Sequence, residues 1–255
     1  MLAEHAASRL IVVKIGSGVI APGGSLDRPV LLDLAAQVAR ARAAGSRVAI
    51  VSSGAVACGM PALGLTTMPT RIVEKQAAAA IGQAILIRAW DEALDPARTS
   101  VAQVLLTAAD LDDRARFLNA RHTLETLLAR GIVPIINEKD TVATDEIRFG
   151  DNDRLAARVA LMAGADMLVL LSDVDGLYSA NPREDAGARR LDVVEAVTPE
   201  IEAMASGVGT EGASGGMVTK LMAAKTATKG GCAMAICRGD VDRPLSALGQ
   251  GAPAT

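Results

Sequence analysis

The sequence predicts an α/β protein, a three-layer α/β/α sandwich with a mainly parallel central sheet. Two observations lead to this prediction. Short apolar runs alternate along the chain with longer segments of helical character, an alternation typical of parallel sheets whose strands are joined through helices. The runs, such as residues 167–171, have apolar residues on both faces, as expected for strands that are buried on both sides. With 255 residues, half of them hydrophobic, the chain can bury such a sheet between two helical layers.

Proline and glycine mark the ends of several expected helices. Pro29 stands in the first turn of the first helix and Gly45 follows its last turn, while Gly131 and Gly164 end two later helices. The expected strands are residues 10–15, 47–51, 101–106, 132–136, 167–171 and 232–237. The expected helices are residues 29–44, 70–93, 112–130, 151–162 and 217–229.

Composition excludes several classes of function. The formal net charge is −3 and only four residues are aromatic, which argues against a nucleic-acid partner. No apolar run approaches the roughly 18 residues of a membrane span. The three cysteines, Cys58, Cys232 and Cys237, have no CxxC spacing and are expected to be reduced thiols of a cytoplasmic protein.

Polar and glycine-rich segments follow four of the expected strands. Lys14 lies near the end of the first strand, just before Gly16, and such a buried lysine is expected to face an anion or to reach water. The other three segments are residues 52–55, 137–140 and 172–176. Each by itself also suits a turn or a helix cap, but parallel strands bring their carboxyl ends to one edge, where ligands bind.

Three phosphate-binding patterns are possible for glycine-rich segments of this kind. Residues 16–21 fit the dinucleotide pattern G-x-G-x-x-G/A, but the second strand ends in serines rather than in the acidic residue that would hold a ribose. No Walker A string occurs. Residues 212–220 form a glycine-rich segment that opens a helix with Lys220 in its first turn; they suit a phosphate, or a linker followed by a surface lysine.

Six segments, in this order and spacing, resemble the amino acid kinase family, and the resemblance covers nearly the whole chain. It is strongest to members that phosphorylate the side-chain carboxylate of free L-glutamate, the first step of proline biosynthesis. The segments are KIGS at 14–17, VSSGAVA at 51–57, INEKDTV at 136–142, FGDND at 149–153, LSDVDGLY at 171–178 and GGMVTK at 215–220.

The resemblance implies a catalytic role for Lys14, Lys220 and Asp153, with the carboxylate orienting two lysines that neutralise the transferred phosphoryl group. It implies that Ser53, Gly54 and Ala55 bind the carboxylates of the substrate, and that Asp140 and Asn152 bind its α-amino group. The implied nucleotide site comprises Lys14, Ser172, Asp173, Ser214, Gly215, Gly216, Met217, Val218, Thr219 and Lys220. ATP and Mg²⁺ are the implied cofactors, and no protein ligand is expected for the metal ion.

The resemblance also bears on organisation and partners. It implies a flexible leader at residues 1–8, one kinase domain at residues 9–255 and no C-terminal PUA domain. The implied partners are L-glutamate, ATP, a second copy of the chain in a dimer or tetramer, and glutamate-5-semialdehyde dehydrogenase.

Two departures and two alternatives stay open. Lys139 stands where the family pattern has asparagine, and Ser214 where it has threonine. The alternatives are another member of the family, such as an N-acetylglutamate kinase, and a non-catalytic nucleotide-binding or storage protein of the same fold. A free amine as the ligand of Asp140 and Asn152 favours L-glutamate over its acetylated form.

Overall fold

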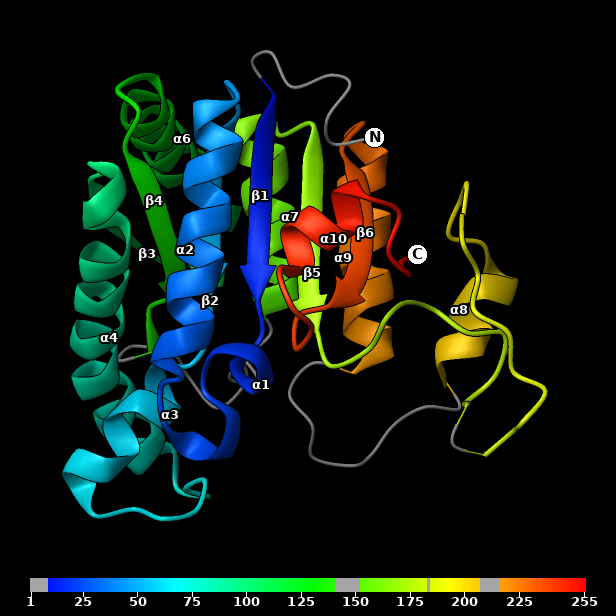
Figure 1. Cartoon of the computed structure of the whole chain (residues 1–255), viewed down its shortest axis with the longest axis horizontal. Coiled ribbons are helices and arrows are strands. Elements are labelled where there is room, and N and C mark those ends of the chain that lie inside the picture. Colours follow the sequence, from blue (N-terminus) through cyan, green and yellow to red (C-terminus); the bar gives the residue numbers. More distant parts are fainter. Residues whose placement is uncertain (1–8, 141–151, 183, 207–215) are drawn as a thin grey trace.

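A six-stranded sheet, parallel throughout, forms the centre of the molecule (Figure 1). The structure is a computed structural model that describes residues 9–140, 152–182, 184–206 and 216–255. The strand order is β3-β4-β2-β1-β5-β6. The strands are β1 (Leu10–Ile15), β2 (Arg47–Ser52), β3 (Val101–Leu106), β4 (Val133–Glu138), β5 (Met167–Ser172) and β6 (Ala233–Arg238). The expected strands and their parallel arrangement are confirmed, with ends that differ by at most two residues.

Helices cover both faces of this sheet. They are α1 (Ser17–Ile20), α2 (Arg28–Ala43), α3 (Ala55–Gly59), α4 (Ile72–Leu94), α5 (Ala108–Asp112), α6 (Arg114–Ala129), α7 (Asn152–Ala163), α8 (Pro199–Ser206), α9 (Met217–Lys229) and α10 (Pro244–Gly249). Short 3₁₀ helices occupy Pro22–Gly24, Met60–Leu63 and Asp95–Ala97.

The alternation of side chains along β1 separates the two cores of the sandwich. Ile11, Val13 and Ile15 pack with buried residues of α2 and α4 on one face. Leu10 and Val12 pack with residues of α6, α7 and α9 on the other. Because successive side chains of a strand point to opposite faces, Lys14 belongs to the face covered by α7 and α9.

The helix expected at residues 112–130 is confirmed as α6 within two residues, but its first residue belongs to a separate short helix. Residues 112–130 do not form a single helix, because α5 ends at Asp112 and α6 begins only at Arg114. Asp113 separates the two helices in an extended conformation, and its carboxylate accepts a hydrogen bond from the backbone N–H of Arg116. A side chain that caps the next helix in this way competes with continuation of the previous one.

The other helix predictions are confirmed within two residues, except that residue 151 lies outside the described residues. Five helices of the described residues were not predicted: α1, α3, α5, α8 and α10 have four to eight residues each and are too short to show a clear period.

Helix α8 and the described residues before it, 184–198, lie away from the sheet, at the right of Figure 1. Beyond α10 the chain returns to the sheet edge, where Ala254 forms an antiparallel bridge with Cys237 of β6. Among the described residues, no helix has both the length and the apolar character needed to cross a bilayer.

Candidate active site

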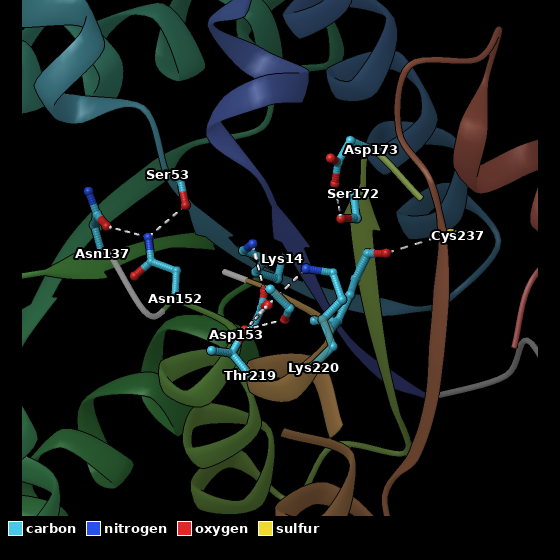
Figure 2. A network of polar contacts seen from close by, with 12 residues as sticks. Lys14, Ser53, Asn137, Asn152, Asp153, Ser172, Asp173, Thr219, Lys220 and Cys237 are labelled. Atoms are coloured by element: carbon cyan, nitrogen blue, oxygen red, sulfur yellow. Dashed lines mark hydrogen bonds and ion pairs between the residues drawn. The ribbon is translucent and has the colours of Figure 1, made fainter. Parts of the chain in front are cut away.

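Two buried lysines share one buried aspartate at the carboxyl end of the sheet (Figure 2). Lys14 comes from β1, Asp153 from the first turn of α7 and Lys220 from the first turn of α9. Lys14 Nζ lies 2.6 Å from Asp153 Oδ1, and Lys220 Nζ lies 3.1 Å from Oδ2. The exposed fractions of the three residues are 7%, 1% and 3%. The arrangement thus holds two ammonium groups at fixed positions away from bulk water.

Lys14, Asp153 and Lys220 form a triad in which the two lysines influence the pKa of the Asp153 carboxyl. Burial alone would raise the pKa of the Asp153 carboxyl, but Lys14 and Lys220 outweigh it and hold that pKa below its ordinary value. One carboxylate between two ammonium groups leaves one net positive charge. Buried charges of this kind are costly unless each is paired, and an anionic ligand would complete the pairing.

The first turn of α9 also contacts Asp153. Gly216 is the residue before the helix and makes no side-chain cap. The Thr219 hydroxyl lies 2.8 Å from the Gly216 carbonyl oxygen and 3.1 Å from Asp153 Oδ2. Asp153 therefore fixes the first turn of α9 as well as the ammonium group of Lys220.

A second polar group lies beside the triad. Asn152 Nδ2 donates to Ser53 Oγ at 2.8 Å and to Asn137 Oδ1 at 2.9 Å. Both N–H bonds of this amide are thereby used. Asn152 Oδ1 is buried and has no hydrogen-bond partner among the described residues, so it remains available as an acceptor.

The turn after β2 places Ser53 at this site. Gly54 adopts φ +102, a left-handed conformation that favours glycine, and a Cβ atom there would lie 3.1 Å from Ile20 Cγ2. The preceding residue, Ser52, is fully buried and accepts a hydrogen bond from Trp90 Nε1 of α4 at 3.2 Å. Ser53 Oγ accepts from Asn152, so its own proton can be donated to a ligand.

Asp140 follows the end of β4 and carries an unusual carboxyl group. Burial, reinforced by the negative charge of Glu138, raises the pKa of Asp140 to about 7. A ligand cation beside it would reverse this effect and favour the ionised form.

At the end of β5, the Ser172 hydroxyl donates to Asp173 Oδ1 at 2.9 Å. The ends of β1 and β5 are joined by a hydrogen bond of 3.1 Å from Gly16 N–H to the Leu171 carbonyl oxygen. Figure 2 shows Ser172 and Asp173 on the side of the lysine pair opposite to Asn152 and Asn137. The site thus has two halves with the lysines between them.

A cavity of about 380 Å³ joins these groups. The predicted residues that line it are Lys14, Ser53, Gly54, Ala55, Asp140, Asn152, Ser172, Asp173 and Lys220. Asp153 lies behind the two lysines and does not itself line the cavity. The structure therefore brings together, from distant parts of the chain, most of the residues that the sequence singled out.

The remaining predicted residues differ in position. Gly216, Met217, Val218 and Thr219 begin α9 but do not line the cavity. Met217 packs against apolar residues, and the Val218 residue is 47% exposed. Ser214 and Gly215 lie outside the described residues. Lys139, the departure from the family pattern, is exposed and does not line the cavity.

Sequence reasoning missed several residues of the site. Lys75 of α4 and Met68 just before that helix both line the cavity, as do Glu138 and Asn137 of β4. Asn137 and Glu138 belong to a segment that the sequence marked, but Lys75 follows no strand and carries no such signal.

No three histidine, cysteine, aspartate or glutamate side chains within the described residues are grouped so that they could hold a metal ion. The polar groups that face the cavity are instead lysines, hydroxyls and amides, together with the carboxyls of Glu138, Asp140 and Asp173. Lysine donors suit phosphate oxygens, and Mg²⁺ commonly enters kinase sites bound to phosphate groups.

Comparisons with known proteins agree with this geometry. The sequence profile of the amino acid kinase family matches residues 9–238. The chain is 56% identical over 248 residues to a glutamate 5-kinase from Cereibacter sphaeroides and 57% identical over 245 residues to one from Paracoccus denitrificans. These alignments cover 97% and 96% of this chain and 67% and 66% of the relatives. The chain thus spans about two thirds of their length.

Solved structures share the fold at low sequence identity. A carbamate kinase from Giardia lamblia bound to AMP-PNP superimposes with a TM-score of 0.67 at 18% identity, covering 97% of this chain and 98% of that one. A UMP kinase from Ureaplasma parvum gives a TM-score of 0.64 at 14% identity, with 97% of each chain covered.

Proposed function

The chain belongs to the amino acid kinase family, and we propose that it transfers the γ-phosphoryl group of ATP to the side-chain carboxylate of L-glutamate. The products are L-glutamyl 5-phosphate and ADP, and the reaction is the first step of proline biosynthesis. The observation that carries the proposal is the pair of buried lysines, Lys14 and Lys220, held by Asp153 at one cavity.

The chemistry explains why this pair is sufficient without a catalytic base. A glutamate side chain has a pKa near ~4.3, so its carboxylate is already ionised and nucleophilic at neutral pH. One of its oxygens forms a bond to the γ-phosphorus while the bond from that phosphorus to the bridging oxygen breaks and ADP leaves. The obstacle is the repulsion between two anions, which fixed positive charge reduces.

The two lysines provide this positive charge from different elements of the fold. Lys14 lies at the end of the central strand, beside the pocket of Ser53 and Asn152, and Lys220 lies at the start of α9. We assign both to the transferred phosphoryl group and the leaving oxygen. Asp153 keeps their ammonium groups apart and oriented, so little reorganisation is needed as charge develops.

The glutamate would occupy the half of the cavity next to Asn152. The Ser53 hydroxyl and the backbone N–H groups of Gly54 and Ala55 would donate to its carboxylates. Its α-ammonium group would lie between the Asp140 carboxylate and Asn152 Oδ1, the buried acceptor that has no partner among the described residues. An acetylated amine would carry one N–H in place of three and no charge for Asp140 to pair.

ATP would occupy the half that contains Ser172 and Asp173 and would also contact residues 214–220, of which Met217 to Lys220 form the first turn of α9. Mg²⁺ bound to its phosphates would neutralise part of their charge, and we assign no protein ligand to this ion.

We further propose that the protein is a cytoplasmic homo-oligomer whose product passes to glutamate-5-semialdehyde dehydrogenase. Acyl phosphates react readily with water, so prompt transfer to the next enzyme would limit their loss. Size-exclusion chromatography with light scattering tests the oligomer, and a single-chain mass would contradict it.

Hydroxylamine trapping tests the proposed reaction directly, because it converts an acyl phosphate into a stable hydroxamate. The purified chain is incubated with ATP, Mg²⁺, hydroxylamine and one acceptor: L-glutamate, N-acetyl-L-glutamate, L-aspartate or none. We expect hydroxamate with L-glutamate and background signal with the others.

The other outcomes assign the protein differently. Signal with the acetylated acceptor would make it an N-acetylglutamate kinase. Silence with every acceptor, together with measurable ATP binding, would identify a binding protein.

A further inference from the structure

A chain of buried side-chain amides connects helix α4 to the proposed glutamate pocket. Asn137 Nδ2 donates to Gln83 Oε1 at 2.8 Å, and Asn137 Oδ1 accepts from Asn152 Nδ2 at 2.9 Å. Asn152 Nδ2 also donates to Ser53 Oγ. Figure 2 shows Ser53, Asn152 and Asn137 side by side. Gln83 is the member of this hydrogen-bonded series that is farthest from Ser53, and it does not line the cavity.

The hydrogen bonds determine which way round each amide lies. Gln83 presents its oxygen, so Asn137 turns its nitrogen toward α4 and its oxygen toward Asn152. Asn152 must then turn its nitrogen toward Asn137, which leaves Oδ1 as the atom offered to a ligand. If Asn137 were reversed, Asn152 would present N–H groups to a substrate ammonium, an unfavourable pairing.

We propose that Gln83 is a positioning residue for substrate recognition: its side-chain oxygen fixes the orientation of the Asn137 amide and thereby that of Asn152, which accepts from the α-ammonium group of the substrate. The inference rests on the proposed function, because it assigns that ammonium group to Asn152. Gln83 acts through two other side chains and touches neither substrate nor nucleotide.

The surroundings of Gln83 favour a specific role over ordinary core packing. The residue is only 8% exposed, and its Nε2 atom is buried with no hydrogen-bond partner in the described parts of the chain. A buried donor without a partner is unfavourable, so an apolar side chain would suit this place better if packing were all that mattered. Within the described residues, the Gln83 side chain forms its hydrogen bond through Oε1, which accepts from Asn137 Nδ2.

Gln83 shares the task of holding Asn137 with one backbone group. The N–H of Glu138 donates to Asn137 Oδ1 at 2.9 Å and supports the same orientation. Removal of the Gln83 side chain should therefore weaken the preference of the Asn137 amide for this orientation without abolishing it. A moderate effect on glutamate binding follows.

The test compares two substitutions at this position. Gln83→Leu keeps the approximate size but removes the acceptor. Gln83→Glu keeps an oxygen at the position of Oε1 and replaces only Nε2, which has no partner among the described residues. Burial favours the uncharged form of the new carboxyl group. Leu86→Val, a packing change at a buried site of the same helix, is the matched control.

We expect Gln83→Leu to raise KM for L-glutamate about tenfold while kcat and KM for ATP stay within about twofold of the parent. Gln83→Glu and Leu86→Val should stay within about threefold of the parent in all three constants.

Three results would overturn the assignment. The first is an unchanged KM for L-glutamate in Gln83→Leu. The second is a fall in kcat of Gln83→Leu together with equal rises in KM for L-glutamate and KM for ATP, and the third is an equal rise of KM for L-glutamate in Leu86→Val. A parent protein without L-glutamate-dependent hydroxamate formation would instead reject the proposed function itself. The two failures are therefore distinguishable.

Discussion

The residue with most influence on the site is Asp153, because it pairs with both lysines and also contacts the Thr219 hydroxyl. Without it, two ammonium groups would lie buried next to each other. The site therefore depends on a carboxylate that needs no direct contact with the substrate. Lys14 and Lys220, by contrast, line the cavity.

Replacement of either lysine tests the charge argument. We expect Lys14→Ala and Lys220→Ala each to lower kcat about 10²- to 10³-fold, since each removes a fixed positive charge from the transferring group. Lys225→Ala is the matched control, because Lys225 belongs to α9 but is exposed and pairs with Glu202. Steady-state rates from the hydroxamate assay provide the measurement. Near-parental rates in either cavity variant would contradict the charge argument.

The Asp140 carboxyl predicts a pH dependence. Its pKa is raised to about 7 by burial and by Glu138, and the ionised form is the one that can pair with an ammonium group. As the pH falls below about 7, protonation should remove this partner, and kcat/KM for L-glutamate should decline toward tenfold per pH unit.

Asp140→Asn should have a low and nearly pH-independent kcat/KM over the same range. A parental profile that stays flat from pH 8 to pH 5.5 would show that Asp140 does not bind the amine.

Much of the candidate site could be predicted from the sequence at this scale, because most of its polar and charged residues lie at or near the ends of strands. Lys14 was recognisable as a charge inside an apolar strand, Ser53 follows β2 directly, and Asp140 lies two residues after β4. Lys75 and Gln83 were not recognisable. They belong to α4, and which face of a helix meets a pocket is decided by tertiary packing rather than by position in the sequence.

At the scale of elements, the helices α3 and α4 pack closely beside the site. A Cβ atom on Gly82 would overlap the Ala55 carbonyl oxygen, and one on Gly59 would overlap the Ala78 carbonyl oxygen. The two helix backbones can approach this closely only because both positions are glycine. Ala55 begins α3 and lines the cavity, so the contact also positions part of the proposed substrate pocket.

Gly82→Ala should consequently affect both stability and binding. The added methyl group must displace the backbone at Ala55, and overpacking of this kind costs about 1–3 kcal/mol. We expect a lower melting temperature and a higher KM for L-glutamate. Ala84→Ser, at an exposed position of the same helix, should change neither. Thermal unfolding and the hydroxamate assay measure the two effects, and a Gly82→Ala protein with parental values in both would disprove the close contact.

Some elements could not be predicted for reasons of length. The five residues of α3 give less than two turns and no measurable period, although their start at Gly54 shapes the pocket. The division of α5 from α6 depends on the Asp113 side chain, whose capping bond outweighs the helical pattern around it.

At the scale of the whole molecule, β1 is the element on which both halves of the sheet depend. It pairs with β2 on one side and with β5 on the other, and its side chains enter both apolar cores. The ion pairs of Asp153 with Lys14 and Lys220 join this strand to α7 and α9 as well. Each of the two cores, one on each face of the sheet, contains residues of β1 and of strands on both sides of it.

The described structure therefore predicts one cooperative unfolding transition. Circular dichroism of the helices and calorimetry should give the same midpoint, with equal calorimetric and van't Hoff enthalpies. L-Glutamate and a non-hydrolysable ATP analogue should each raise that single midpoint, because each binds only the folded chain. Two separate transitions would contradict the expectation of one kinase domain over residues 9–255.

The hydrogen bond between Trp90 and Ser52 gives the protein a built-in optical probe. Trp90 is the single tryptophan of the chain, is fully buried, and contacts the residue that precedes Ser53 in the proposed glutamate pocket. Indole emission depends on the polarity and hydrogen bonding around the ring. Movements of the pocket during glutamate binding can consequently be followed by fluorescence on the millisecond scale, without a label and without an added chromophore.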